Sequence, residues 1–215
     1  ACAGIIVGVI SLTGVGARFS ALLLSVAAAS QLLALVFAML IAIILGMGMP
    51  TTAAYAVAAS VVAPGLVQMG IEPLIAHFFV FYFAVISAIT PPVALAAYAG
   101  AGIAGADPMR TSVESFRVGL AAFIVPFMFF YSQGLLMEGA WAVIARNCVT
   151  ALVGVWFLSA AATGYFFGRA PAVARGLLLL AALMMIAGGA LTDAAGLGLG
   201  LALWAWRRVA APQKA

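Results

Sequence analysis

Long apolar runs constrain this chain more than any other feature. No charged residue stands between Arg18 and Glu72, whereas a helix needs only about 20 apolar residues to cross roughly 30 Å of hydrocarbon. The composition agrees, because 67% of the residues are hydrophobic and only 7% are charged. Since a backbone inside a bilayer must satisfy its own hydrogen bonds, the sequence predicts an all-α, polytopic membrane protein.

Two proline-containing segments interrupt these runs, residues 44–52 (ILGMGMPTT) and residues 87–93 (SAITPPV). Proline has no amide donor and disfavours the α conformation in the residue before it, so a helix breaks there. Unwound backbone at membrane depth is tolerated only around a binding site or cavity, and secondary transporters use such breaks to bind substrates and ions. A single break is more often a packing kink, but two together favour a shared site.

The first interruption predicts a re-entrant helical hairpin over about residues 31–69. Its two helices, residues 31–46 and 51–64, are both short for a membrane span. The glycines at the tip permit unusual backbone angles, and Pro50 is expected at the first position of the returning helix. Thr51 and Thr52 would then supply hydroxyl groups at that helix terminus.

The second interruption predicts a broken membrane helix over about residues 74–104. Carbonyl groups near residues 87–89 are expected to lose their intrahelical partners, while amides after Pro92 point into the same gap. Such ends offer a cation site and an anion site together. Hydroxyl and carbonyl oxygens without a fixed carboxylate suit sodium better than calcium or magnesium.

The remaining segments predict further helices. Residues 3–13 are too short to span and either end a span or continue through a kink at Gly14 and Gly16. A surface helix is expected over about residues 107–117, with Asp107 as its N-cap. The further spans predicted from the apolar runs cover residues 118–137, 140–165, 174–191 and 195–206.

The distribution of basic residues predicts an orientation in the membrane. Placing the basic tail, residues 207–214, inside also places Arg169 and Arg175 inside and Asp193 outside. Arg146 then falls on the outer side, so the rule fits imperfectly.

Several function classes receive no support from the sequence. The net charge of +4 comes from scattered basic residues that form no patch for nucleic acid. His77 is a lone imidazole and is expected to be packed or interfacial. No serine–lysine or serine–histidine pair lies at membrane depth and no HExxH motif occurs, so we expect neither an enzyme nor a cofactor. A channel or a non-transporting scaffold remains an alternative to a transporter.

The sequence resembles the large membrane subunit of TRAP transporters, in particular the TAXI subtype with fused small and large subunits. The resemblance covers roughly residues 1–137. It is carried by residues 1–10 (ACAGIIVGVI), 45–55 (LGMGMPTTAAY), 76–83 (AHFFVFYF), 89–98 (ITPPVALAAY) and 104–109 (AGADPM).

This resemblance implies a secondary transporter in a bacterial inner membrane. Members take up small organic acids delivered by a periplasmic substrate-binding protein, usually with sodium, by an elevator motion. Their large subunit has two inverted repeats, each with a re-entrant hairpin and a broken helix. Residues 1–137 resemble the second repeat, and residues 138–215 resemble helices appended to some fusions. Because the chain opens ACAG, without an initiator methionine, we expect the small subunit and first repeat to precede it in a longer polypeptide.

The resemblance also implies site residues. The second sodium site of the family carries over to Gly46, Ser87, Thr90 and Val93, which contribute mainly backbone oxygens, with the side chain of the threonine in addition. The positions that flank the substrate carboxylate carry over to Thr51, Thr52, Pro91 and Pro92. Ser87 stands where many relatives have glycine, and the two hairpin threonines stand where other subtypes have an acidic residue.

Overall fold

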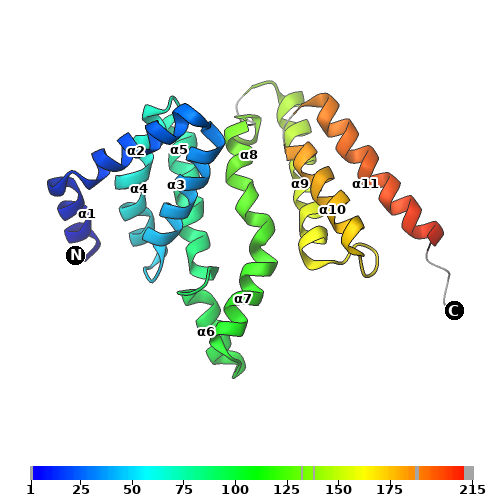
Figure 1. Cartoon of the computed structure of the whole chain (residues 1–215), viewed down its shortest axis with the longest axis horizontal. Coiled ribbons are helices and arrows are strands. Elements are labelled where there is room, and N and C mark those ends of the chain that lie inside the picture. The colour runs from blue at the N-terminus through cyan, green and yellow to red at the C-terminus, as the bar shows by residue number, and fades with distance from the viewer. Residues whose placement is uncertain (1, 132, 138, 187–188, 211–215) are drawn as a thin grey trace. The chain divides into compact units, whose positions relative to one another are not determined.

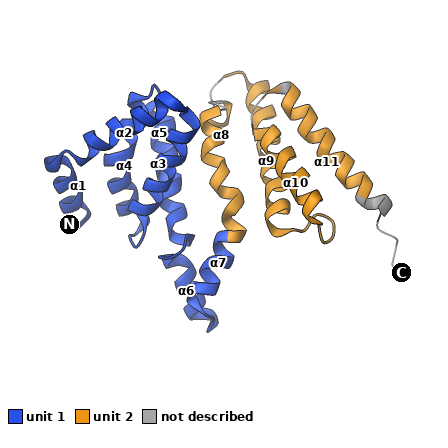
Figure 2. Cartoon of the chain, in the orientation of Figure 1, with its two compact units in different colours: residues 1–116 blue, residues 117–215 orange. Residues whose placement is uncertain are grey.

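The computed structural model describes residues 2–131, 133–137, 139–186 and 189–210 (Figure 1). Helices make up nearly all of this part of the chain, and the predicted all-α, polytopic class is confirmed. The chain divides into two compact units, residues 1–116 and 117–215 (Figure 2). Each unit is described by itself below.

Three helices of the described part are long and apolar enough to cross a membrane, or four if one bent pair counts as a single span. The three are Thr51–Gln68, Pro108–Tyr131 and Trp141–Thr163, and the bent pair is Cys2–Thr13 with Val15–Ala29. The helix from Thr51 is longer than the sequence pattern predicted. It continues through Pro64 to Gln68, because membrane helices tolerate an internal proline when neighbouring groups satisfy the freed backbone.

The first unit begins with a kinked pair, α1 (Cys2–Thr13) and α2 (Val15–Ala29). The two helices meet at 67°. Gly14 allows the bend because its φ of 67° lies in the left-handed region, which glycine enters without steric cost. The predicted kink at Gly14 is therefore confirmed, while Gly16 lies inside α2.

The helical hairpin consists of α3 (Gln31–Gly46) and α4 (Thr51–Gln68), which pack against each other. The Ser30 hydroxyl accepts a hydrogen bond from the Leu33 amide and caps the start of α3. At the tip, Gly48 has a φ of 77° and reverses the chain. Pro50 is the N-cap of α4, one position earlier than predicted.

The broken helix follows as α5 (Pro73–Ile86), the 3₁₀ turn η1 (Ser87–Ile89) and α6 (Leu95–Ala104). Both α3 and α4 pack against α5. Their shared core combines small side chains with a few large ones, and includes Ala38, Ala58, Val62, Phe79 and Phe83. Small residues let membrane helices approach closely, so the hairpin lies tightly against the broken helix.

The predicted N-cap of the next helix is confirmed. The Asp107 carboxylate accepts a hydrogen bond of 2.7 Å from the Arg110 amide, and α7 (Pro108–Gly119) begins at the next residue. The chain then continues through η2 (Leu120–Ile124) into α8 (Val125–Tyr131). Helical backbone therefore runs from the predicted surface segment into the predicted span without a loop, because glycine at position 119 stays helical with a φ of −75°.

The second unit contains η3 (Gln133–Leu136), α9 (Trp141–Thr163), α10 (Ala172–Ile186) and α11 (Ala190–Ala210). α10 packs against both α9 and α11. The sequence predicted spans over residues 174–191 and 195–206. This prediction misplaced the boundary between α10 and α11. The Thr192 hydroxyl accepts a hydrogen bond of 3.1 Å from the Gly189 amide, and this local bond begins α11 at Ala190.

Candidate functional site

The two interrupted segments meet inside the first unit. A Cβ atom built on Gly46, at the end of α3, would lie 2.6 Å from the Ser87 hydroxyl oxygen and 3.1 Å from the Ala84 carbonyl. A Cβ on Gly48 would lie 3.6 Å from the Val93 side chain. The hairpin tip and the helix break are therefore in direct contact, and only a residue without a side chain fits at Gly46.

The polar residues at this contact are buried. Ser87 is 1% exposed and Thr90 is 8% exposed, and Gly46 is buried. Val93 is different, since its side chain is 37% exposed. The predicted cation ligands thus lie around one contact, three of them buried and one at its edge.

Local hydrogen bonds satisfy some of the backbone groups at the helix break. The Thr90 amide donates to the Ser87 carbonyl at 3.2 Å, and the Thr90 hydroxyl donates to the Ile86 carbonyl at 2.9 Å. The Ser87 hydroxyl donates to the Ala84 carbonyl at 2.6 Å. The expectation that carbonyls near residues 87–89 lose their partners therefore fails for Ser87, because the chain tightens into a 3₁₀ turn before it breaks.

The donor set suits a weakly held monovalent cation. The Ser87 and Thr90 hydroxyls each donate their single hydrogen to a carbonyl, so the lone pairs of both hydroxyl oxygens remain available as acceptors. Carbonyl oxygens have two lone pairs, so one hydrogen bond does not exhaust them. Among the described residues, no group of three or more histidine, cysteine, aspartate or glutamate side chains could hold a metal ion. Neutral oxygens are therefore the available ligands at this contact.

The residues predicted to flank the substrate belong to the same two interrupted segments and differ in their exposure. Thr51 and Thr52 open α4 and are exposed. No side chain caps this terminus, so the first amides of α4 lack intrahelical partners. Pro91 is half-buried and Pro92 is exposed, and the peptide bond between them is cis.

The sequence analysis did not predict the contacts of two tyrosines. The Tyr98 hydroxyl donates a short hydrogen bond to the Pro92 carbonyl and ties α6 back to the break. The Tyr55 hydroxyl lies 2.9 Å from Nδ1 of the exposed His77. A signal existed for Tyr98, because a hydroxyl one turn into a helix can reach back to a carbonyl before it. Nothing in the sequence pointed to the Tyr55–His77 pair.

Comparison with known families identifies the family of this chain. The family of the DctM component of the tripartite ATP-independent periplasmic transporters matches residues 1–144 of the 215. The chain belongs to this family. Comparison with curated proteins and with solved structures found no match. The DctM family is a family of transporter components, so this chain is a multi-pass membrane component of a three-part transporter.

Proposed function

We propose that this DctM-family chain takes part in sodium-coupled uptake of small organic acids across a bacterial inner membrane. A periplasmic TAXI-type binding protein would deliver the substrate. A first repeat and a small membrane subunit would complete the transporter. One observation supports the proposal above all, which is the direct contact between the hairpin tip at Gly46 and the helix break at Ser87.

Sodium would bind where the hairpin tip meets the break. The ligands would be backbone oxygens of Gly46, Ser87 and Val93 with both oxygens of Thr90. Support comes from the burial of Ser87 and Thr90 and from the direction of the Thr90 hydroxyl bond, which leaves the oxygen as an acceptor. A site of neutral oxygens holds sodium weakly enough to release it on each cycle, as a coupling ion requires.

The substrate carboxylate would lie at the amino termini of α4 and α6. The Thr51 and Thr52 hydroxyls with the first amides of α4 would flank it on one side, and Pro91 and Pro92 with the amides that follow them on the other. Helix amino termini attract anions because their N–H groups are unpaired and the helix dipole is positive there.

The two sites would be coupled by charge. Bringing a carboxylate into a low-dielectric region costs free energy unless an opposite charge accompanies it. Sodium at the adjacent contact would offset this cost, so each ligand would bind more tightly when the other is present. This reciprocity would make transport of the acid depend on sodium.

Replacement of Thr90 tests the proposed function. In proteoliposomes of the complete transporter with its binding protein, T90A should raise the sodium concentration for half-maximal uptake about tenfold, equivalent to about 1.4 kcal/mol. T90S retains the hydroxyl and should behave nearly as the parent. S60A is the matched structural control, because it removes a similar hydroxyl bond, 2.8 Å long, to the Val57 carbonyl within α4.

An unchanged sodium dependence in T90A, with normal protein in the membrane, would overturn the sodium site. Uptake that proceeds at full rate without the binding protein would favour a channel instead.

A further inference from the structure

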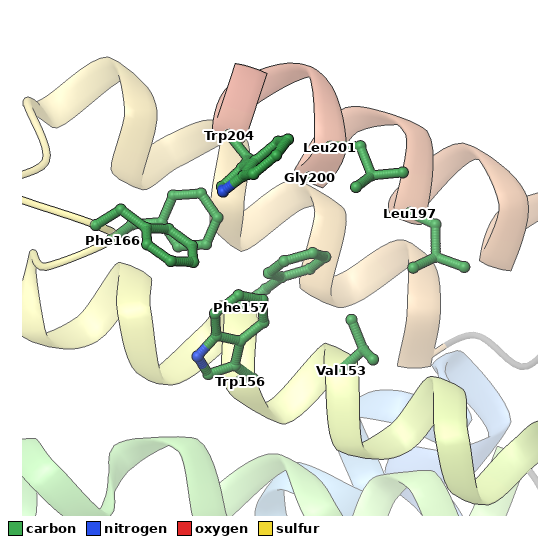
Figure 3. A pocket seen from close by; sticks show the side chains of 9 residues that line it. Val153, Trp156, Phe157, Phe166, Leu197, Gly200, Leu201 and Trp204 are labelled. Carbon is green, nitrogen blue, oxygen red and sulfur yellow. The ribbon is translucent and has the colours of Figure 1, made fainter. Parts of the chain in front are cut away.

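An apolar cavity of about 220 Å³ lies within the second unit (Figure 3). Trp156 and Phe157 of α9, Phe166 of the following loop, and Leu201 and Trp204 of α11 line much of it. The lining is almost wholly carbon. The volume is below the roughly 300–1,000 Å³ of ordinary small-molecule pockets, so the cavity suits a slender apolar chain rather than a compact polar ligand.

The Phe157 ring of α9 reaches across to α11 beside the cavity. A Cβ on Gly200 of α11 would lie 2.2 Å from this ring, so the ring contacts the α11 backbone there. The Phe157 ring cannot swing away easily, because it is 4% exposed and packs at 6.1 Å from the Phe166 ring. Beyond this contact the helices leave the space that the aromatic rings surround (Figure 3).

The cavity opens to the side of the unit. Trp156 is 49% exposed and Leu201 is 61% exposed, although both line the cavity. Since α9 is long and apolar enough to span a membrane, we expect this opening to face lipid chains. An acyl chain could enter it without crossing a polar barrier.

The adjacent end of the unit is basic. α9 ends and α10 begins there, and the loop between them carries Phe166 and Phe167 toward the cavity and is closed by a β-bridge from Tyr165 to Arg169. Arg175 in the first turn of α10 donates to the last carbonyls of α9, those of Ala161 at 2.8 Å and Ala162 at 3.2 Å.

In the sequence, the loop between α9 and α10 and the last turn of α11 contain basic residues and no acidic ones. Asp193 is the acidic residue of the three helices and stands in the first turn of α11, where its carboxylate lies 3.9 Å from Arg146 at the opposite end. The two ends of this helical group therefore differ in charge.

We propose that this cavity and the basic end beside it form a binding site for one anionic phospholipid. One acyl chain fills the space between α9 and α11, and the phosphate lies at Arg169 and Arg175. Arg175 uses two of its five N–H donors on the α9 carbonyls, which leaves others for a phosphate oxygen. Basic groups beside an apolar space between membrane helices are the chemistry that selects anionic head groups.

Native mass spectrometry of the full chain in detergent tests this site. Phosphatidylglycerol should bind as a single adduct about tenfold more tightly than phosphatidylcholine with the same acyl chains. R169Q should weaken the phosphatidylglycerol adduct about fivefold, because one basic group near a head group contributes about that factor. R110Q removes an equal charge from exposed α7 in the first unit and should leave the adduct unchanged.

A second pair of variants tests the cavity itself. L201F adds volume to a lining residue and should weaken the adduct at least fivefold. L152F makes the same change at a 72% exposed position of α9 that does not line the cavity and should have no effect. Equal retention of the two lipids, or equal behaviour within either variant pair, would show that the adducts are bulk lipid around the helices and would overturn the site.

Discussion

Gly46 illustrates how one residue decides the geometry of the candidate site. It ends α3, is buried, and its Cα faces the Ser87 hydroxyl and the Ala84 carbonyl across the contact. The Ala84 carbonyl belongs to backbone that cannot rotate away. The absence of a side chain at Gly46 therefore determines how closely the hairpin tip approaches the break.

The G46A variant should lose about 1–3 kcal/mol of stability, the range for added atoms in a tight core. We expect a lower Tm in a thermal unfolding assay of the detergent-solubilised protein. G100A is the control, because a Cβ on this helical glycine of α6 meets nothing within 4 Å. It should leave the Tm unchanged or raise it, since alanine favours helix over glycine by up to about 1 kcal/mol.

Adding S87G to G46A should recover part of the lost Tm. This second change removes the two Ser87 atoms that lie 2.6 and 3.0 Å from the new Cβ, while the Ala84 carbonyl at 3.1 Å remains. An equal Tm for G46A and G100A would contradict the close contact.

At the scale of elements, glycines also decide how α11 packs in the second unit. A Cβ on Gly196 would lie 2.8 Å from the Ala181 carbonyl of α10 and 2.6 Å from the Met185 side chain. Gly198 lies between Gly196 and Gly200 on the same helix, and a Cβ there meets nothing within 4 Å. Small residues at fixed helical spacing are a common basis for close packing of membrane helices.

The G196A variant should separate α11 from α10, because a backbone carbonyl cannot make room for the added methyl group. We expect about 1–3 kcal/mol of destabilisation, seen as a lower Tm in thermal unfolding of the detergent-solubilised protein. G198A adds the same atoms on the same helix and should match the parent in Tm. An equal Tm for the two variants would argue against this packing.

At the scale of the whole molecule, charge distribution sets the expected orientation. Arg169 and Arg175 lie at one end of α9 and α10, while residues 139–140 precede α9 at its other end. Basic residues in short loops remain on the cytoplasmic side. The predicted orientation started from the basic tail, residues 207–214, of which residues 211–214 lie outside the part of the chain that the structure describes.

Single cysteines test this orientation in a background with C2A and C148A. Y165C should resist a membrane-impermeant maleimide in intact cells and react after permeabilisation. A140C should react in intact cells. Both positions are exposed in the structure. The reverse pattern would invert the orientation, and labelling of both from outside would mean that α9 does not span the membrane.

Much of this fold could be predicted from the sequence because its causes are local. Long apolar runs require helices in lipid, Asp107 before a proline predicts an N-cap, and the prolines at positions 50, 91 and 92 mark where helices stop. The errors were local as well. Pro64 does not end α4, and the start of α11 depends on the hydrogen bond from the Gly189 amide to the Thr192 hydroxyl, which a hydrophobicity pattern does not predict.

The amino-acid sequence by itself determined that the chain is a helical membrane protein whose helices are interrupted at two places. Hydrogen bonding and proline chemistry act over a few residues, so both can be predicted locally. The tertiary structure alone decided how closely Gly46 approaches Ser87, that Tyr98 reaches Pro92, and that side chains of α9, α11 and the loop after α9 surround a cavity. These contacts depend on shape complementarity between nearly uniform apolar surfaces. In lipid such surfaces differ little in hydrophobicity, so only their packed shapes distinguish one arrangement from another.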